Sequence, residues 1–156
     1  MRAFRLRALA EAPTAFGSTL ARETVFTDAT WRERAERGAS GVDSITFVAE
    51  HDGRWVGLAS GLAFDPDVPD DPRPELVSMF VAPEARGCAL GEALVDAVAD
   101  WAASRRATGL CLWVTATNAA AIRLYAKCGF RPTGEEKPLA HSPALSLLRM
   151  ARDFAQ

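Results

Sequence analysis

The fold of this chain is decided by the segment Leu76-Val77-Ser78-Met79-Phe80-Val81-Ala82-Pro83-Glu84-Ala85-Arg86-Gly87-Cys88-Ala89-Leu90-Gly91. Its order predicts an apolar strand, a short turn, and a run of small residues that opens a helix. The first N–H groups of a helix lack partners within it, and the helix dipole favours negative charge there. Small residues at such a helix start let a bulky phosphate approach the backbone, beside the fixed charge of Arg86. The segment therefore predicts an anion-binding site.

A simpler interpretation of the same small residues stays open. Small residues at a strand-to-helix turn often serve only the close packing of a helix against a sheet. Gly91 is not followed by the Lys-Ser/Thr pair of a P-loop, and the chain contains no Gly-x-Gly-x-x-Gly of the kind that binds dinucleotides. The segment alone thus leaves phosphate binding and plain packing as alternatives.

A second segment, Asn118-Ala119-Ala120-Ala121-Ile122-Arg123-Leu124-Tyr125-Ala126-Lys127-Cys128-Gly129-Phe130, follows another apolar strand at Leu110 to Thr115. Together with Arg86-Gly87-Cys88-Ala89-Leu90-Gly91, this pair of motifs resembles the GNAT superfamily of acyl-CoA-dependent N-acetyltransferases, from about Ser44 to the C-terminus. In that family the first motif wraps the pyrophosphate of coenzyme A. The second motif brings an asparagine, here Asn118, near the pantetheine arm and a tyrosine, here Tyr125, near the thioester sulfur.

The resemblance implies acetyl-CoA as acyl donor and assigns a set of residues to it. The pantetheine amides would pair with the backbone of an extended strand, and the phosphates would lie at the start of the following helix. Ala89 stands where the family has a glycine and Cys88 where a basic residue is frequent, which predicts weaker binding than usual. Lys127 would reach the 3′-phosphate or belong, with Arg123, to a solvated helix face. The implied cofactor residues are Met79, Phe80, Val81, Arg86, Gly87, Cys88, Ala89, Leu90, Gly91, Glu92, Asn118, Ala121 and Lys127.

The reaction implied is direct attack of a primary amine on the thioester. Tyr125 would donate its hydroxyl proton to the departing thiolate, which needs no strong perturbation because phenol and thiol have pKa values of about 10 and 8.5. Glu75 is the first choice for the base that deprotonates the amine, and His141 or an ordered water chain are alternatives. His51, beside the Asp52-Gly53 turn, is interpreted as structural. On residue type alone, Tyr125 could be only a half-buried aromatic, Glu75 a surface carboxylate and Asn118 an N-cap.

The composition agrees with one domain that spans residues 1–156. Apolar residues make up 49% of the chain, yet no run approaches the length of a membrane helix, and the start lacks the pattern of a signal peptide. A net charge of -2 gives no electrostatic reason for nucleic-acid binding. The three cysteines have no metal-ligand spacing, so no metal is expected, and reduced thiols favour a cytoplasmic location.

The remaining pattern predicts a mixed α/β fold (α+β in some schemes) with a mostly antiparallel central sheet flanked by helices. N-terminal helices include one that starts with Phe16-Gly17-Ser18 and one from about Trp31 to Arg37, capped by Thr30. Asp52-Gly53 predicts a hairpin between strands at 44–50 and 54–64, and a loop spans 65–74. The next helix should be closed by Gly109, and the last two strands should span 131–137 and 144–151. The family's first edge strand is not seen, which would leave a sheet edge that a homodimer could cover.

The acceptor cannot be read from these motifs beyond its chemical class, a small-molecule or peptide amine. A concentration of acidic residues would attract a cationic amine or form only solvated turns; they are Asp65, Asp67, Asp70, Asp71 and Glu75. Two other classes of function also stay open. A non-catalytic acyl-CoA-binding sensor would not need Tyr125, and a structural adaptor would need neither motif.

Overall fold

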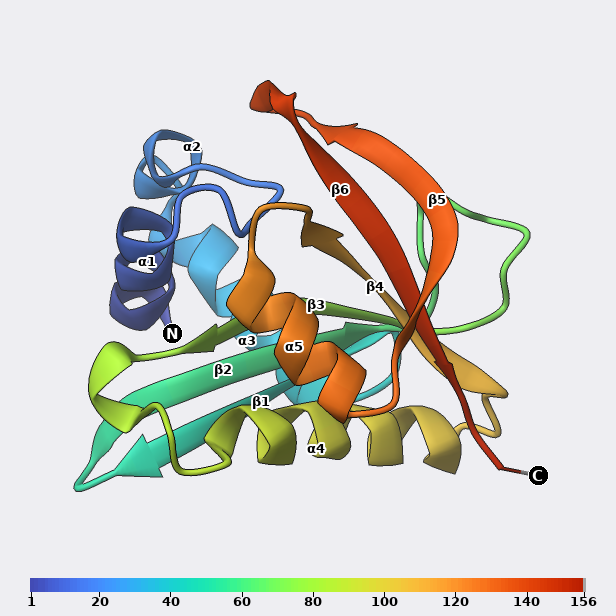
Figure 1. Ribbon diagram of the computed structural model, residues 1–156. Helices are drawn as coiled ribbons and strands as arrows, with labels where there is room; N and C mark the ends of the chain where they lie inside the picture. The colour runs from blue at the N-terminus through green and yellow to red at the C-terminus, as the bar shows by residue number, and fades with distance from the viewer. Residues whose placement is uncertain (156) are drawn as a thin grey trace.

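The computed structural model describes residues 1–155. Three helices come first, then a sheet with two further helices inserted between its strands (Figure 1). The bounds are α1 Arg2–Glu11, α2 Leu20–Thr24, α3 Asp28–Ser40, β1 Ser44–His51, β2 Arg54–Leu62, β3 Glu75–Val81, the 3-10 turn η1 Pro83–Ala85, α4 Leu90–Ser104, β4 Gly109–Thr115, α5 Ala119–Lys127, β5 Arg131–Leu139 and β6 Ser142–Asp153. The six strands lie in the order β1-β2-β3-β4-β6-β5, and only β3 and β4 are parallel. The predicted mixed, mostly antiparallel sheet is confirmed.

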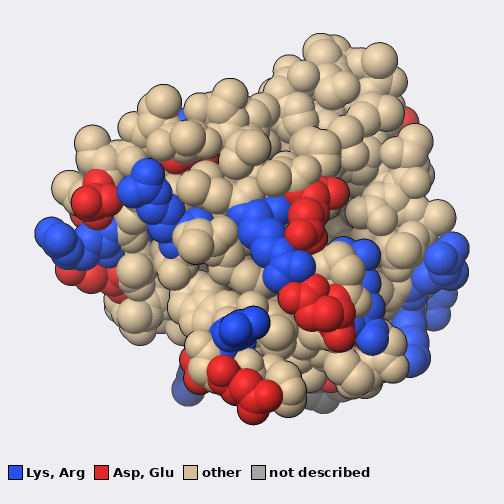
Figure 2. All heavy atoms as spheres, turned by 90° about the vertical axis from the view of Figure 1, so that its left-hand side faces the viewer, with Lys and Arg blue, Asp and Glu red and all other residues tan. Residues whose placement is uncertain are grey.

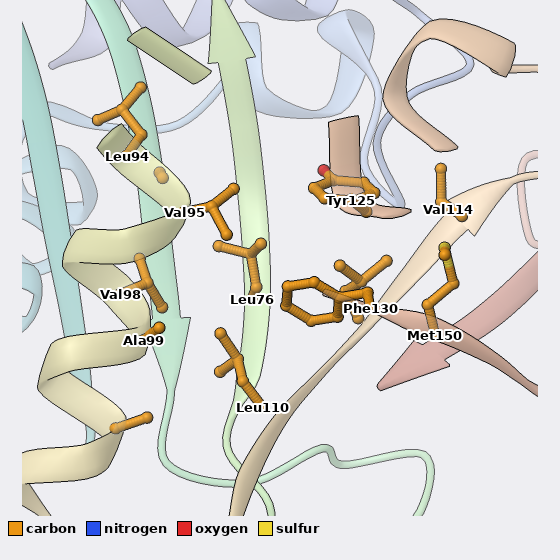
Figure 3. Close-up of a cluster of buried hydrophobic side chains, with 13 residues drawn as sticks. Leu76, Leu94, Val95, Val98, Ala99, Leu110, Val114, Tyr125, Phe130 and Met150 are labelled. Atoms are coloured by element: carbon orange, nitrogen blue, oxygen red, sulfur yellow. The ribbon is translucent and has the colours of Figure 1, made fainter. Parts of the chain in front are cut away.

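Helices cover both faces of the sheet. On one face α4 packs closely because Gly57 and Gly61 leave room for it. A Cβ added at Gly57 would lie 2.9 Å from Leu94, and one at Gly61 would lie 2.6 Å from the ring of Trp101. The main core lies here, where the buried side chains of α4 point toward Leu76, Leu110 and Phe130 (Figure 3). On the opposite face α1 forms a smaller apolar cluster with β2 and β3, which includes Phe4, Leu9, Phe16, Leu58 and Phe80.

In the middle of β3, the alternation of side chains between the two faces of the sheet is interrupted. Ser78 has a positive φ of 57°, and the β2–β3 register jumps by an extra residue at this point. Such a bulge reverses the alternation of side chains. Leu76 therefore belongs to the core beneath α4, whereas Phe80 belongs to the cluster beneath α1. The parallel pairing with β4 covers only Glu75 and Leu76, so the two strands separate at the bulge.

The end of α5 follows the sequence prediction closely. Gly129 has a φ of 90°, its N–H donates to the Ala126 carbonyl, and the Phe130 N–H donates to the Tyr125 carbonyl. This is the hydrogen-bond pattern of a Schellman motif, in which glycine avoids the strain of a left-handed residue. Asn118 begins the helix as its N-cap, and its side chain accepts a hydrogen bond from the Ala121 N–H at 3.2 Å.

Several predicted boundaries were wrong. Helix α3 begins at Asp28 with Thr27 as its N-cap, because Thr27 rather than Thr30 accepts a hydrogen bond from a backbone N–H three residues on. Helix α2 likewise begins at Leu20 behind Thr19, not at Phe16. Helix α4 ends at Ser104, well before Gly109, and Arg106 takes the left-handed position with a φ of 61°.

Gly109 instead begins β4, where the backbone of β6 passes very close. A Cβ at this position would lie 2.5 Å from the carbonyl oxygen of Arg152. The glycine therefore marks a close approach of two strands and not a helix end. The last two strands also extend beyond the predicted limits, to Leu139 and Asp153.

The edges of the sheet are β1 and β5. Within residues 1–155 no strand precedes α1, and the homodimer that would cover the edge at β1 stays a prediction. In this part of the chain no helix combines the length and apolar character needed to cross a bilayer.

Candidate functional site

A groove of about 860 Å³ runs between the separated ends of β3 and β4. The turn after β3, the first residues of α4 and one face of α5 complete its walls. The groove brings together Tyr125 and every predicted cofactor residue. These residues are Met79, Phe80, Val81, Arg86, Gly87, Cys88, Ala89, Leu90, Gly91, Glu92, Asn118, Ala121 and Lys127.

The start of α4 offers unpaired hydrogen-bond donors to the groove. The N–H groups of Gly87, Cys88 and Ala89 donate to no group within residues 1–155, and Gly87 and Ala89 have φ values of 80° and 61°. The 15-residue helix that follows adds its dipole at the same point. Ala89 thus takes a left-handed conformation that glycine adopts without strain, which explains why this position suits glycine. The arrangement can bind an anion through backbone groups.

Two charged side chains border this anion site. Arg86 donates from Nε to the Val81 carbonyl at 3.0 Å, which holds its guanidinium beside the β3 wall, 6.0 Å from the centre of the Phe80 ring. Lys127 pairs with Glu92 at 2.7 Å and so joins α5 to α4 across the groove. On the surface that contains α1 and η1, basic and acidic side chains likewise lie next to each other, without a broad area of one sign (Figure 2).

The β3 wall presents an unpaired backbone edge. Met79, Phe80 and Val81 lie beyond the last pairing with β4, so the edge facing β4 has no strand partner there. An extended amide-containing ligand can add to such an edge through main-chain hydrogen bonds. Three residues of β4 form the opposite wall and were not predicted from the sequence; they are Trp113, Val114 and Thr115.

Tyr125 lies at the bottom of the groove and is 7% exposed. Its ring packs against Phe130 and points into the space between β3 and β4 (Figure 3). Burial raises the pKa of the Tyr125 hydroxyl above its ordinary value, so the group keeps its proton across the physiological range. The hydroxyl makes no hydrogen bond to a protein group in the described part of the chain, which leaves it free for a ligand.

Glu75 does not line the groove. It is buried at the point where β3 and β4 pair, not exposed at a strand end, and burial together with the nearby Asp65 charge raises its pKa to about 8. Its side chain lies on the face of the sheet that α1 and α3 cover, because its cross-strand partner Leu62 faces that side. Nε2 of the alternative base His141 lies 2.7 Å from the Phe16 carbonyl, and His51 is exposed beside Asp52.

The loop at residues 63–74 is tied to the sheet by a buried arginine that the sequence analysis missed. Arg149 of β6 is 2% exposed and hydrogen-bonds to Asp65 at 3.3 Å and to Asp71 at 2.8 Å. Lys137 pairs with Asp67. Three of the loop's four acidic residues are therefore paired, and only Asp70 has no ion-pair partner within residues 1–155. Asp65 also accepts a hydrogen bond from Trp113 Nε1 at 3.0 Å, which orients one wall of the groove.

Comparison with known proteins agrees with this geometry. A mycothiol acetyltransferase from Acidothermus cellulolyticus is 37% identical over 100 residues, which cover 58% of this chain and only 31% of that protein. The ribosomal-protein-alanine N-acetyltransferase of Brucella melitensis is 28% identical and superposes with a TM-score of 0.70, over 99% of this chain and 96% of its own. The yncA protein of Salmonella typhimurium, solved with acetyl-CoA, shares the fold at 21% identity, with a TM-score of 0.78 over 99% of this chain and 87% of its own. Residues 7–130 match the acetyltransferase (GNAT) family, so the chain belongs to that family.

Proposed function

We propose that this protein is an N-acetyltransferase that moves an acetyl group from acetyl-CoA to a primary amine. One observation carries the proposal: a single groove combines unpaired amides at a helix start, an unpaired strand edge and the hydroxyl of a largely buried tyrosine. These features match the three parts of acetyl-CoA, its pyrophosphate, its pantetheine amides and its thioester. The acetyl-CoA in the solved Salmonella relative supports this choice of ligand.

Different residues of the groove would bind different parts of acetyl-CoA. The amides of Gly87, Cys88 and Ala89, with Arg86 beside them, would hold the pyrophosphate. The backbone of Met79 to Val81 would pair with the pantetheine amides and direct one N–H at the thioester oxygen. Lys127 would reach the 3′-phosphate only by leaving Glu92, and this exchange is possible because the Lys127 side chain is largely exposed.

The chemistry needs one proton donor and one proton acceptor. Acetyl-CoA supplies an activated acetyl group, whose carbonyl carbon the neutral amine nitrogen attacks. As the carbon–sulfur bond breaks, Tyr125 would give its proton to the leaving thiolate. The amine nitrogen also loses a proton during the reaction, and Glu75 is the proposed acceptor of that proton. Since Glu75 lies outside the groove, a water would have to connect the two.

The acceptor class proposed is a small-molecule or peptide amine. Relatives with known structures include a nourseothricin acetyltransferase and enzymes named for ribosomal-protein alanine, so both kinds of acceptor occur among proteins of this fold. The second proposal is a non-catalytic sensor of acyl-CoA, which the same groove would also serve. The Tyr125 hydroxyl, which lines the groove without a protein partner in residues 1–155, favours the enzyme, because a sensor gains nothing from it.

Calorimetric titration with acetyl-CoA and with coenzyme A tests the ligand directly. We expect binding of both in the micromolar range, and release of free thiol when a panel of amines is added. Absence of binding would overturn both proposals. Binding without thiol release for any amine, in the presence of intact acetyl-CoA, would favour the sensor.

A further inference from the structure

A second cavity lies on the opposite face of the sheet from α4, over the first three strands. It has a volume of about 220 Å³ and is covered by α1 and α3. Four hydroxyl side chains from the strands form much of its floor, namely Ser44, Thr46, Ser60 and Ser78. Three arginines from the two helices line it from above, namely Arg5, Arg34 and Arg37. We refer to these residues as the arginine pocket.

The arginine pocket has more positive charge than the protein neutralises. Arg5 and Arg34 share one buried carboxylate, Glu23, at distances of 2.8 and 2.9 Å. Arg37 forms no ion pair with any residue in the range 1–155, and no Asp or Glu among these residues lines the pocket. Three arginines against one glutamate leave an excess of two positive charges. A guanidinium group without an acidic partner, here that of Arg37, is suited to a planar oxyanion when hydroxyl donors lie beside it.

The position of the pocket connects it to the proposed reaction. Ser78 is the bulge residue of β3, next in sequence to Met79 in the groove wall, and Arg5 Nη1 lies 3.4 Å from its hydroxyl. Val77, two residues from Glu75, also lines the pocket. The pocket thus adjoins the point where β3 and β4 separate, on the face opposite to the main core. Strand β3 therefore contributes consecutive residues first to the arginine pocket and then to the groove.

We propose that the arginine pocket binds the carboxylate of the acceptor, so that the acceptor is a small amine that carries a carboxylate, such as an amino acid. This inference rests on the proposed acetyl transfer and specifies its substrate class. The volume agrees with a small group, since sites for drug-sized ligands begin at about 300 Å³. The hydroxyls of Thr46 and Ser60 hydrogen-bond to each other at 2.8 Å, and Arg37 is the lining arginine without an ion-pair partner within residues 1–155.

The test compares amino acids with their carboxamides, which keep the amine and replace the negatively charged carboxylate with a neutral amide. We expect at least one of alanine, glutamate and phenylalanine to be acetylated with a kcat/KM about tenfold or more above that of its carboxamide. Arg37→Gln should abolish this preference while the KM for acetyl-CoA stays unchanged. The matched control is Arg32→Gln, which removes an exposed arginine from the same helix outside the pocket and should keep the preference.

The outcomes separate this inference from the proposed function. Equal rates for acids and carboxamides, or a preference that survives Arg37→Gln, would overturn the carboxylate site while acetyl transfer stands. Acetyl-CoA binding with no acetylation of any of the three amino acids would also overturn it. Failure to bind acetyl-CoA would instead remove the proposed function itself. Arg37 suits the test because its exposed side chain holds no buried partner, unlike Arg5.

Discussion

The rings of Tyr125 and Phe130 lie edge to face, with centroids 5.9 Å apart and planes at 61°. The backbone of the same two residues is joined by the hydrogen bond that ends α5. Packing and helix termination therefore hold the Tyr125 ring in place, and its hydroxyl has no structural partner among the described residues. The hydroxyl can be removed without disturbing the position of the ring.

Tyr125→Phe is therefore expected to separate catalysis from binding. Loss of the proton donor should lower kcat by about 10²-fold, a typical contribution of general acid catalysis. The affinity for coenzyme A and the melting temperature should stay close to those of the wild type, because the ring remains. Steady-state kinetics and calorimetry measure the two effects. Unchanged kcat in the variant would eliminate Tyr125 as the acid.

Ala89→Gly should increase stability, although glycine is usually destabilising. Ala89 has a φ of 61°, and a left-handed alanine costs about 1–2 kcal/mol, which glycine avoids. The greater freedom of glycine in the unfolded chain offsets about 0.4–1 kcal/mol of this gain. We expect a net increase of about 0.5–1 kcal/mol in the free energy of unfolding, measured by urea denaturation.

The matched control for this substitution is Ala93→Gly. Ala93 is exposed in the first turn of the same helix, where glycine should destabilise by about 1 kcal/mol. Opposite signs for the two variants would support strain at Ala89, whereas destabilisation in both would contradict it.

Gly109→Ala should destabilise the protein, because the added methyl group would meet the Arg152 carbonyl oxygen of β6 at 2.5 Å. Relief requires movement of backbone, so we expect a loss of about 1–3 kcal/mol. Gly17→Ala is the matched control, since nothing lies within 4 Å of a Cβ at that position. Thermal denaturation measures the melting temperatures of the two variants. Similar values would contradict this prediction, because they would mean that β4 and β6 can move apart with little loss of stability.

Glu75 should make stability depend on pH in a specific direction. Burial raises its folded-state pKa from 4.5 to about 8, so the folded protein holds this proton more tightly than the unfolded chain. The stabilisation that the folded protein gains by holding this proton is complete below pH 4.5 and is lost as the pH rises through 8. Glu75→Gln, which stays neutral, should remove this dependence and be more stable than the wild type at pH 8 by roughly 1–3 kcal/mol.

Urea denaturation between pH 5 and about 9 measures this effect. Glu33→Gln removes an exposed carboxylate that pairs with no described residue and should retain the wild-type profile. Parallel profiles for wild type and Glu75→Gln would contradict the raised pKa. If Glu75 is also the base, its variant should have a lower kcat in the same pH range.

The sequence by itself determined those features that depend only on residues close together along the chain. The apolar strand before Pro83, the Asp52-Gly53 hairpin, the Asn118 cap and the Gly129 helix end follow from local conformational preferences, and the structure confirms them. The cofactor residues were assigned by the resemblance of two continuous motifs to the GNAT superfamily, and the structure brings both motifs into one groove.

Only the tertiary structure decided the features that depend on distant segments. The bulge at Ser78, the separation of β3 from β4, the close approach at Gly109 and the burial of Glu75 all depend on what neighbouring strands do. Arg149 looks like any strand arginine until folding brings Asp65 and Asp71 to it across about 80 residues of sequence. The arginine pocket likewise exists only when α1, α3 and three strands meet, since a charge excess has no local sequence pattern.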